Sequence, residues 1–102
     1  MQIVEIKNNF KEEVLDYKGK VLVDFYADWC GPCKMLRPVL EDFANTNENI
    51  KVVSVNVDKA EKLAREYAVM SIPCLVVIES GTEKNRSVGF IPKEQIEKIV
   101  EE

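Results

Sequence analysis

Strand-like and helix-like hydrophobic patterns alternate along this chain of 102 residues. Short runs rich in β-branched and aromatic residues are typical of strands, whereas apolar residues three or four positions apart form one face of a helix. The strand-like runs are residues 2–6, 21–27, 50–58 and 74–78, with a more polar run at 83–88. The inward faces of the predicted helices comprise Phe10, Val14 and Leu15; Leu36, Val39, Leu40 and Phe43; Ala60, Leu63, Ala64 and Tyr67; and Ile96, Ile99 and Val100.

The order of these elements is β-α-β-α-β-α-β-β-α, which predicts an α/β fold in one domain spanning residues 1–102. Strands joined through helices are expected to be parallel, and the turn at residues 80–82 predicts a final antiparallel hairpin. The nearly continuous apolar run at 21–27 is typical of a strand buried on both faces. We therefore expect a central mixed sheet of about five strands, flanked on both faces by about four helices.

Composition and charge describe an ordinary globular protein, with 46% hydrophobic and 31% charged residues. The net charge is −4 and there is no basic cluster, so we expect no binding to nucleic acid or to an anionic membrane. No run approaches the roughly 20 apolar residues of a membrane span, and the first ten residues do not resemble a secretory signal. The expected setting is the cytoplasm, where a lasting structural disulfide is disfavoured.

Two cysteines, Cys30 and Cys33, lie three positions apart in WCGPCK, where a helix is predicted to follow the buried strand. Free N–H groups and the helix dipole stabilise a thiolate at such a helix start. Pro32 fits the first helical turn, and Gly31 leaves the first sulfur uncrowded. A bond between the two sulfurs would close too short a loop to contribute much to folding, so its plausible use is to be made and broken. We expect Cys30 to be exposed and to attack first, and Cys33 to lie deeper and attack second.

Asp24 interrupts an otherwise apolar strand. Burial without a partner is costly for a carboxylate and should raise its pKa. In the functional interpretation, Asp24 accepts the proton of Cys33. In the alternative, it faces a solvated edge or forms a hidden hydrogen bond.

A metal site is the other interpretation of a CxxC motif. Zinc usually takes four Cys or His ligands, whereas this chain has three cysteines and no histidine. We therefore expect no metal, although Cys74 leaves open an iron–sulfur cluster shared between two chains.

Three motifs together resemble the thioredoxin family: VDFYADWCGPCK at residues 23–34, followed by Pro38, then SIPCL at 71–75 and VGF at 88–90. The resemblance runs essentially from end to end. It implies a thioredoxin fold, reduction of protein disulfides, and renewal by a thioredoxin reductase-type electron donor. It also implies disulfide-containing protein substrates and no cofactor beyond a redox-active Cys30–Cys33 disulfide. We further expect a monomer.

The resemblance also implies roles for single residues. Cys30 would be the nucleophile, Cys33 the resolving thiol and Asp24 the buried acid that exchanges a proton with Cys33. The residues expected to bind substrate are Trp29, Gly31, Pro32, Ile72, Pro73 (in a cis peptide bond) and Gly89.

Two positions depart from the family's pattern. Cys74 occupies the place of a common threonine, either as a small packing residue or as a thiol that takes part in redox regulation. Ser54 stands where a lysine often lies near the buried acid, so the means by which Asp24 is tuned stays open.

Two other functions compete with disulfide reduction. A thioredoxin-like domain can serve as a binding or assembly subunit without using its chemistry, but the intact CxxC argues against this. An oxidase or isomerase is the other alternative, and the Gly-Pro pair with the expected cytoplasmic setting favours reduction.

Overall fold

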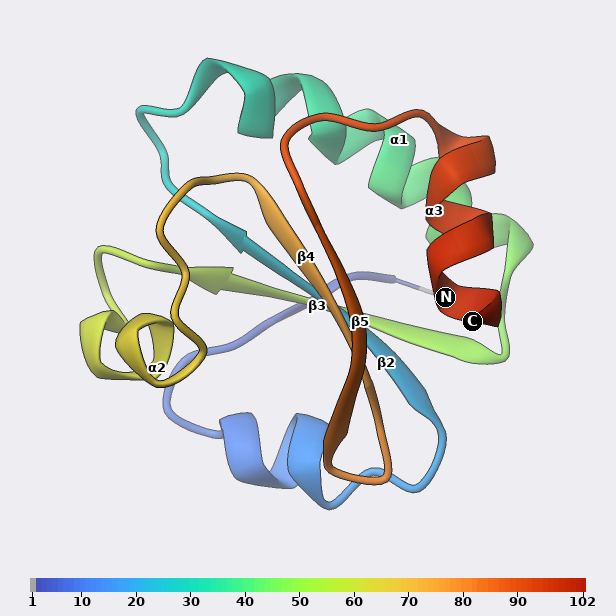
Figure 1. Cartoon of the computed structure of the whole chain (residues 1–102), viewed down its shortest axis with the longest axis horizontal. Helices are drawn as coiled ribbons and strands as arrows, with labels where there is room; N and C mark the ends of the chain where they lie inside the picture. The colour runs from blue at the N-terminus through green and yellow to red at the C-terminus, as the bar shows by residue number, and fades with distance from the viewer. Residues whose placement is uncertain (1) are drawn as a thin grey trace.

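A five-stranded mixed sheet forms the centre of the molecule (Figure 1). The structure is a computed structural model and describes residues 2–102. In sheet order the strands are β1 (Val4–Glu5), β3 (Ile50–Asn56), β2 (Lys20–Tyr26), β4 (Cys74–Glu79) and β5 (Thr82–Val88). The helices are η1 (Lys11–Leu15, a single π-helical turn), α1 (Gly31–Thr46), α2 (Glu61–Glu66) and α3 (Lys93–Glu101). The predicted element order and the predicted mixed α/β sheet with flanking helices are confirmed.

The strand directions differ in part from the expectation. β3 is parallel to both β1 and β2, and β4 and β5 form the expected antiparallel hairpin. However, β4 runs antiparallel to β2, so the prediction that all strands joined through helices are parallel is wrong for β4. Phe25 of β2 lies opposite Val55, near the end of β3, and also opposite Cys74, the first residue of β4. The connection that contains α2 therefore returns the chain to the end of the sheet at which β3 finishes, and β4 runs back from there.

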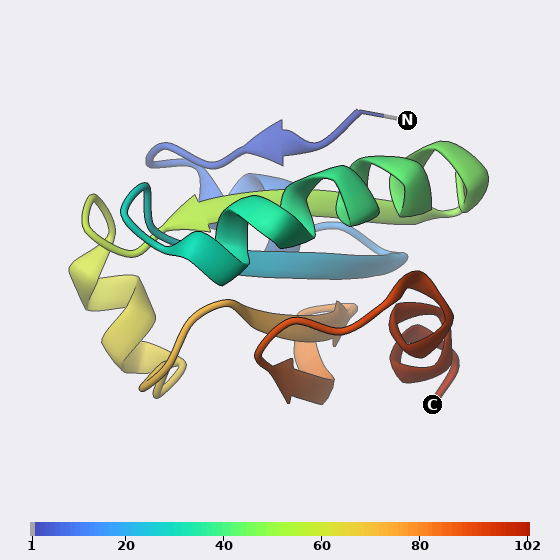
Figure 2. The same cartoon turned by 90° about the horizontal axis from the view of Figure 1, so that it is seen from above.

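Helices cover both faces of the sheet, with α1 and α3 on one side and η1 and α2 on the other (Figure 1). Successive side chains of a strand point to opposite faces. In β2, Leu22 therefore packs with Leu36 and Leu40 of α1, while Val23 and Phe25 pack in the opposite core cluster. Figure 2 shows α1 extending along the sheet.

The N-terminal region also departs from the prediction. Phe10 and Val14 are buried, but Leu15 is 37% exposed, so its predicted inward position is wrong. η1 is a single turn closed by the N–H of Asp16, which donates to the carbonyl of Lys11 at 2.8 Å. Its buried residue is Val14, and because adjacent residues of a helix do not share a face, Leu15 is left at the surface.

Candidate active site

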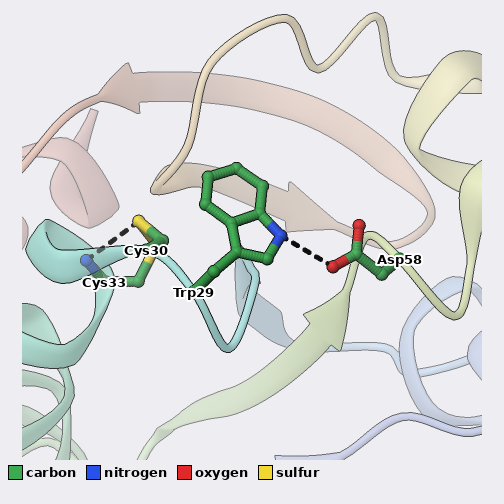
Figure 3. Close-up of a disulfide and its surroundings, with 4 residues drawn as sticks. All are labelled: Trp29, Cys30, Cys33 and Asp58. Atoms are coloured by element: carbon green, nitrogen blue, oxygen red, sulfur yellow. Dashed lines mark hydrogen bonds between the residues drawn. A yellow bond between two sulfur atoms is a disulfide. The ribbon is translucent and has the colours of Figure 1, made fainter.

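The central strand β2 leads directly into the two cysteines. Cys30 is the N-cap residue of α1, with an extended backbone (φ −91°, ψ 110°), and Pro32 lies in the first turn. Cys30 and Cys33 form a disulfide with their Cα atoms 5.2 Å apart. The backbone N–H of Cys33 donates to Cys30 Sγ at 3.2 Å (Figure 3). This N–H would stabilise a negative charge on the Cys30 sulfur after the disulfide opens.

Both active-site cysteines are buried in this disulfide form. Cys30 is 4% exposed and Cys33 is 5% exposed, so the expectation of an exposed Cys30 above a deeper Cys33 is wrong here. The physical reason is packing, because Ala27 is buried with the two cysteines, and Val57 and Ile72 pack against them. Accessibility therefore does not distinguish the two sulfurs, whereas the N–H donated to Cys30 does.

Trp29 lies on the surface beside the disulfide (Figure 3). Its side chain is 70% exposed, and its Nε1 donates to Asp58 Oδ2 at 2.9 Å. Trp29, Met70 and Ile72 contribute to the lining of one surface hollow of about 410 Å³. Met70 is 92% exposed, so this hollow presents apolar side chains to solvent.

Three of the residues predicted to bind substrate, Ile72, Pro73 and Gly89, lie in the segments that flank the β4–β5 hairpin. The Ile72–Pro73 peptide bond is cis, as expected, and the Pro73 carbonyl accepts from the N–H of Gly89 at 2.8 Å. Gly89 has a φ of +94°, which favours glycine, and a Cβ added there would meet nothing within 4 Å. The space beside Gly31 is likewise open. These glycines leave the surface around the motif unobstructed.

Asp24 is buried in the sheet, which excludes the interpretation of a solvated carboxylate. It is 2% exposed, and its Oδ1 has no hydrogen-bond partner among residues 2–102. Asp24 points to the face that α1 covers, because Leu22, two residues earlier, packs against that helix. Burial raises the pKa of Asp24 to about 7; the charge of Arg37 lowers it and that of Glu5 raises it. A carboxyl with this pKa exchanges protons at neutral pH.

Arg37 is the site residue that sequence reasoning missed. Its Nη1 donates to Ser54 Oγ at 2.8 Å, and Ser54 lies directly opposite Asp24 in the β2–β3 pairing. Arg37 comes four residues after Cys33, so the two share a face of α1. That spacing was the available signal, but it did not reveal which strand residue the guanidinium would contact.

Cys74 is 1% exposed and belongs to the core cluster on the opposite face of the sheet from α1. Burial raises the pKa of its thiol, while Arg86 acts in the opposite direction. Both observations support the interpretation of Cys74 as a packing residue. Within residues 2–102, no three or more Cys, Asp or Glu side chains gather where they could hold a metal ion.

A redox-active pair at the start of a helix, reached from the central strand of a mixed α/β sheet, defines the class of CxxC thiol–disulfide oxidoreductases. The model of the family described as "Thioredoxin" matches residues 2–102. The chain belongs to the thioredoxin family, and it is a thiol–disulfide oxidoreductase that reduces protein disulfides.

Several curated relatives are similar over most of their length. The chain is 46% identical to thioredoxin of Bacillus subtilis over 84 residues, or 81% of each chain. It is 43% identical to thioredoxin 1 of a Nostoc species over 95 residues, covering 92% of this chain and 89% of the relative. It is 40% identical to thioredoxin of Chlamydia trachomatis over 100 residues, covering 98% and 95%.

One solved structure is also similar. It comes from work on the thiol-resolving mechanism of yeast mitochondrial 1-Cys peroxiredoxin via glutathione/thioredoxin systems. It has a TM-score of 0.88 and 27% sequence identity, and the match covers 99% of this chain and 96% of that one.

Proposed function

We propose that Cys30 is the nucleophile, Cys33 the resolving thiol and Asp24 the base of this reductase. The observation that carries the proposal is the position of Cys30 at the N-cap of α1, where its sulfur accepts the N–H of Cys33. The same donor would hold the Cys30 thiolate in the reduced protein. Cys30 is therefore the better nucleophile of the pair.

The reaction proceeds in two thiol exchanges. The Cys30 thiolate attacks one sulfur of a substrate disulfide, so that the substrate S–S bond breaks, a mixed disulfide forms and one substrate thiolate leaves. Cys33 then loses its proton and attacks Cys30 Sγ, releasing the second substrate thiolate. Two electrons pass to the substrate, its two thiolates take up two protons, and the Cys30–Cys33 disulfide remains.

Asp24 supports the second exchange. Cys33 is buried, so water is a poor acceptor for its proton. A carboxyl with a pKa of about 7 is ionised in about half of the molecules at neutral pH, so it can take up this proton and later release it.

The substrate-binding surface in this proposal surrounds the disulfide. Trp29 and Ile72 supply apolar contact, and the backbone next to Pro73 pairs with an extended substrate segment. Gly31 and Gly89 keep the approach to Cys30 open. Pro32 fixes the first turn of α1 between the two thiols.

We propose further that the protein acts as a single-domain monomer in the cytoplasm and needs no cofactor beyond the Cys30–Cys33 disulfide. Its partners are disulfide-containing proteins and a thioredoxin reductase-type electron donor. No helix within residues 2–102 has the length and apolar character to cross a membrane.

Thiol substitutions test the assigned roles. Cys30→Ser is expected to abolish reduction of insulin disulfides, because the first exchange cannot start. Cys33→Ser is expected to complete the first exchange and accumulate mixed disulfides with substrate, measurable by mass spectrometry. Cys74→Ser is the matched control and is expected to keep the wild-type rate. Mixed disulfides formed through Cys33 in the Cys30→Ser variant would reverse the assignment.

A further inference from the structure

A polar cluster surrounds the buried Asp24 at the junction of α1 with β1, β2 and β3. Ser54 of β3 lies opposite Asp24 in the strand pairing, and Arg37 reaches over from α1 to donate to its hydroxyl at 2.8 Å. Glu5 of β1 accepts from the hydroxyl of Tyr26 at 2.7 Å. On the other side of β2, the residue opposite Asp24 is the apolar Leu75 of β4. Arg37 is therefore the cation, and Glu5 the anion, whose charges act on Asp24.

Two contacts hold the guanidinium of Arg37 in place. Besides the bond to Ser54, its Nε lies 3.6 Å from Glu41 Oε2, one turn along α1. Its side chain is 38% exposed while Ser54 is fully buried, so the guanidinium spans the boundary between solvent and the buried carboxyl. A charge at such a boundary keeps its hydration while still acting on the interior.

Arg37 and Cys33 also line the same cavity, of about 280 Å³, together with Glu5, Tyr26, Asp28 and Lys34. The resolving thiol and the cation therefore adjoin one hollow next to the strand that carries Asp24. The charge of Arg37 therefore acts in the same region of the molecule as the resolving thiol.

We propose that Arg37, held by Ser54, is a positioning residue for the second thiol exchange, because its positive charge keeps part of the Asp24 carboxyl ionised and ready to accept the Cys33 proton. This inference rests on the proposed role of Asp24 as the base. Ser54 is then the hydroxyl that anchors the Arg37 guanidinium, which explains how the pKa of Asp24 is tuned although position 54 carries no lysine.

Electrostatics sets the direction of the effect. Burial raises the pKa of Asp24 to about 7 even though Arg37 lowers it, so loss of the Arg37 charge leaves burial and Glu5 to raise it further. An increase of about one unit, at the lower end of the usual effect of a nearby charge, would cut the ionised fraction at pH 7 from about a half to about a tenth. The rate of the second exchange would fall about fivefold.

The test compares Arg37→Gln with Arg65→Gln, which removes the same charge from an exposed position on α2. Asp24 is titrated in each reduced protein by carbon-13 NMR of its carboxyl group. Separately, release of reduced peptide from a mixed disulfide at Cys30 is followed across pH in a single turnover. For Arg37→Gln, the carboxyl titration and the midpoint of the rate profile are both expected to move up by about one pH unit. Arg65→Gln is expected to leave both within about 0.2 unit.

Two further variants separate charge from structure. Arg37→Lys keeps the charge and is expected to recover at least about half of the shift in both readouts. Ser54→Ala removes the anchor and keeps the charge, and it is expected to move both readouts in the same direction by a smaller amount. An Asp24 titration that is unchanged in Arg37→Gln, or shifted equally in Arg65→Gln, would overturn the proposal.

The Asp24→Asn variant distinguishes failure of this inference from failure of the role given to Asp24. If Asp24 is the base, Asp24→Asn slows the second exchange, and adding Arg37→Gln to it has no further effect on the rate profile. If Asp24→Asn leaves the profile unchanged, the proposed base is wrong and the catalytic role of Arg37 falls with it. If Asp24→Asn slows the exchange but Arg37→Gln does not shift its pH midpoint, only the inference about Arg37 is overturned.

Discussion

The three cysteines differ because each has a different local environment. Cys30 is the N-cap residue of α1, and its sulfur accepts a hydrogen bond from the backbone N–H of Cys33. Cys33 lies in the first turn of α1 and forms the disulfide with Cys30. Cys74 begins β4 instead, opposite Phe25 of β2 and inside the core. The thiolate is the reactive form of a cysteine, and both burial and the raised pKa of Cys74 disfavour it.

The expected consequence is slow alkylation of Cys74 in the folded, oxidised protein. A maleimide should label it at least about tenfold more slowly than in denaturant, because the buried thiol reacts only after local opening. The measurement is the labelled fraction against time by mass spectrometry, with Cys74→Ser as the unlabelled control. Equal rates in the native and denatured protein would mean that Cys74 is an accessible thiol and would revive its regulatory interpretation.

At the scale of elements, the ends of α1 and β5 each place a glycine near the site for a different reason. Gly31 is the first residue of α1, where any residue can adopt the helical backbone, while Gly89 follows β5 with a φ of +94°. An added Cβ has free space at both positions. The two positions therefore differ in how well their backbone angles tolerate a side chain, and not in the space available for one.

Alanine substitution at the two positions should have opposite effects on stability. Gly89→Ala is expected to lower the free energy of unfolding by about 1–2 kcal/mol, because side chains disfavour a positive φ. Gly31→Ala is expected to leave it unchanged or raise it by up to about 1 kcal/mol, as alanine is the better helix former. Urea unfolding of both variants measures the difference. A neutral Gly89→Ala would show that the turn after β5 does not need glycine.

At the scale of the whole molecule, the core on the α1 side of the sheet contains a carboxyl among apolar side chains. Asp24 follows Leu22 on this face, where α1 and α3 bury Leu36, Phe43 and Ile96. Burial raises its pKa from 3.8 to about 7, so the folded protein holds a proton that the unfolded chain has released. The buried carboxyl therefore lowers the free energy of unfolding at neutral pH. The same raised pKa lets Asp24 act as a base at that pH.

The free energy of unfolding should therefore depend on pH in a defined window. Between about pH 4 and 7, Asp24 keeps its proton in the folded protein but releases it in the unfolded chain. The contribution of Asp24 to the free energy of unfolding is therefore fully present below about pH 4 and is lost as the pH rises through 7. Asparagine does not titrate, so the Asp24→Asn variant does not lose this free energy as the pH rises. It is expected to be more stable than the wild type at pH 8 by roughly 2–4 kcal/mol and about equal to it at pH 4.

Chemical denaturation at several pH values measures this difference. Asp42→Asn, which removes a 62% exposed carboxyl from α1, is the control. A difference between Asp24→Asn and the wild type that does not vary with pH would contradict a raised pKa for Asp24.

The sequence by itself determined the chemistry and most of the element order. The motif around Cys30 and Cys33 could be interpreted locally, because the two thiols and the helix start that stabilises a thiolate lie within one turn of chain. Asp24 was predictable as a buried acid because it interrupts an apolar strand. Local periodicity likewise predicted each strand and helix within a few residues, since these patterns depend on near neighbours.

Only the tertiary structure decided how distant segments meet. The direction of β4 depends on how residues 57–73 return the chain to the sheet. The burial of Cys30 depends on Val57 and Ile72, which lie far from it in the sequence. The bond from Arg37 to Ser54 joins residues 17 positions apart on a helix and a strand. Hydrophobic periodicity predicts which face of a helix or strand a residue lies on, because it depends on near neighbours in the sequence. It does not predict which distant residue that side chain contacts, because such contacts form only when the whole chain packs.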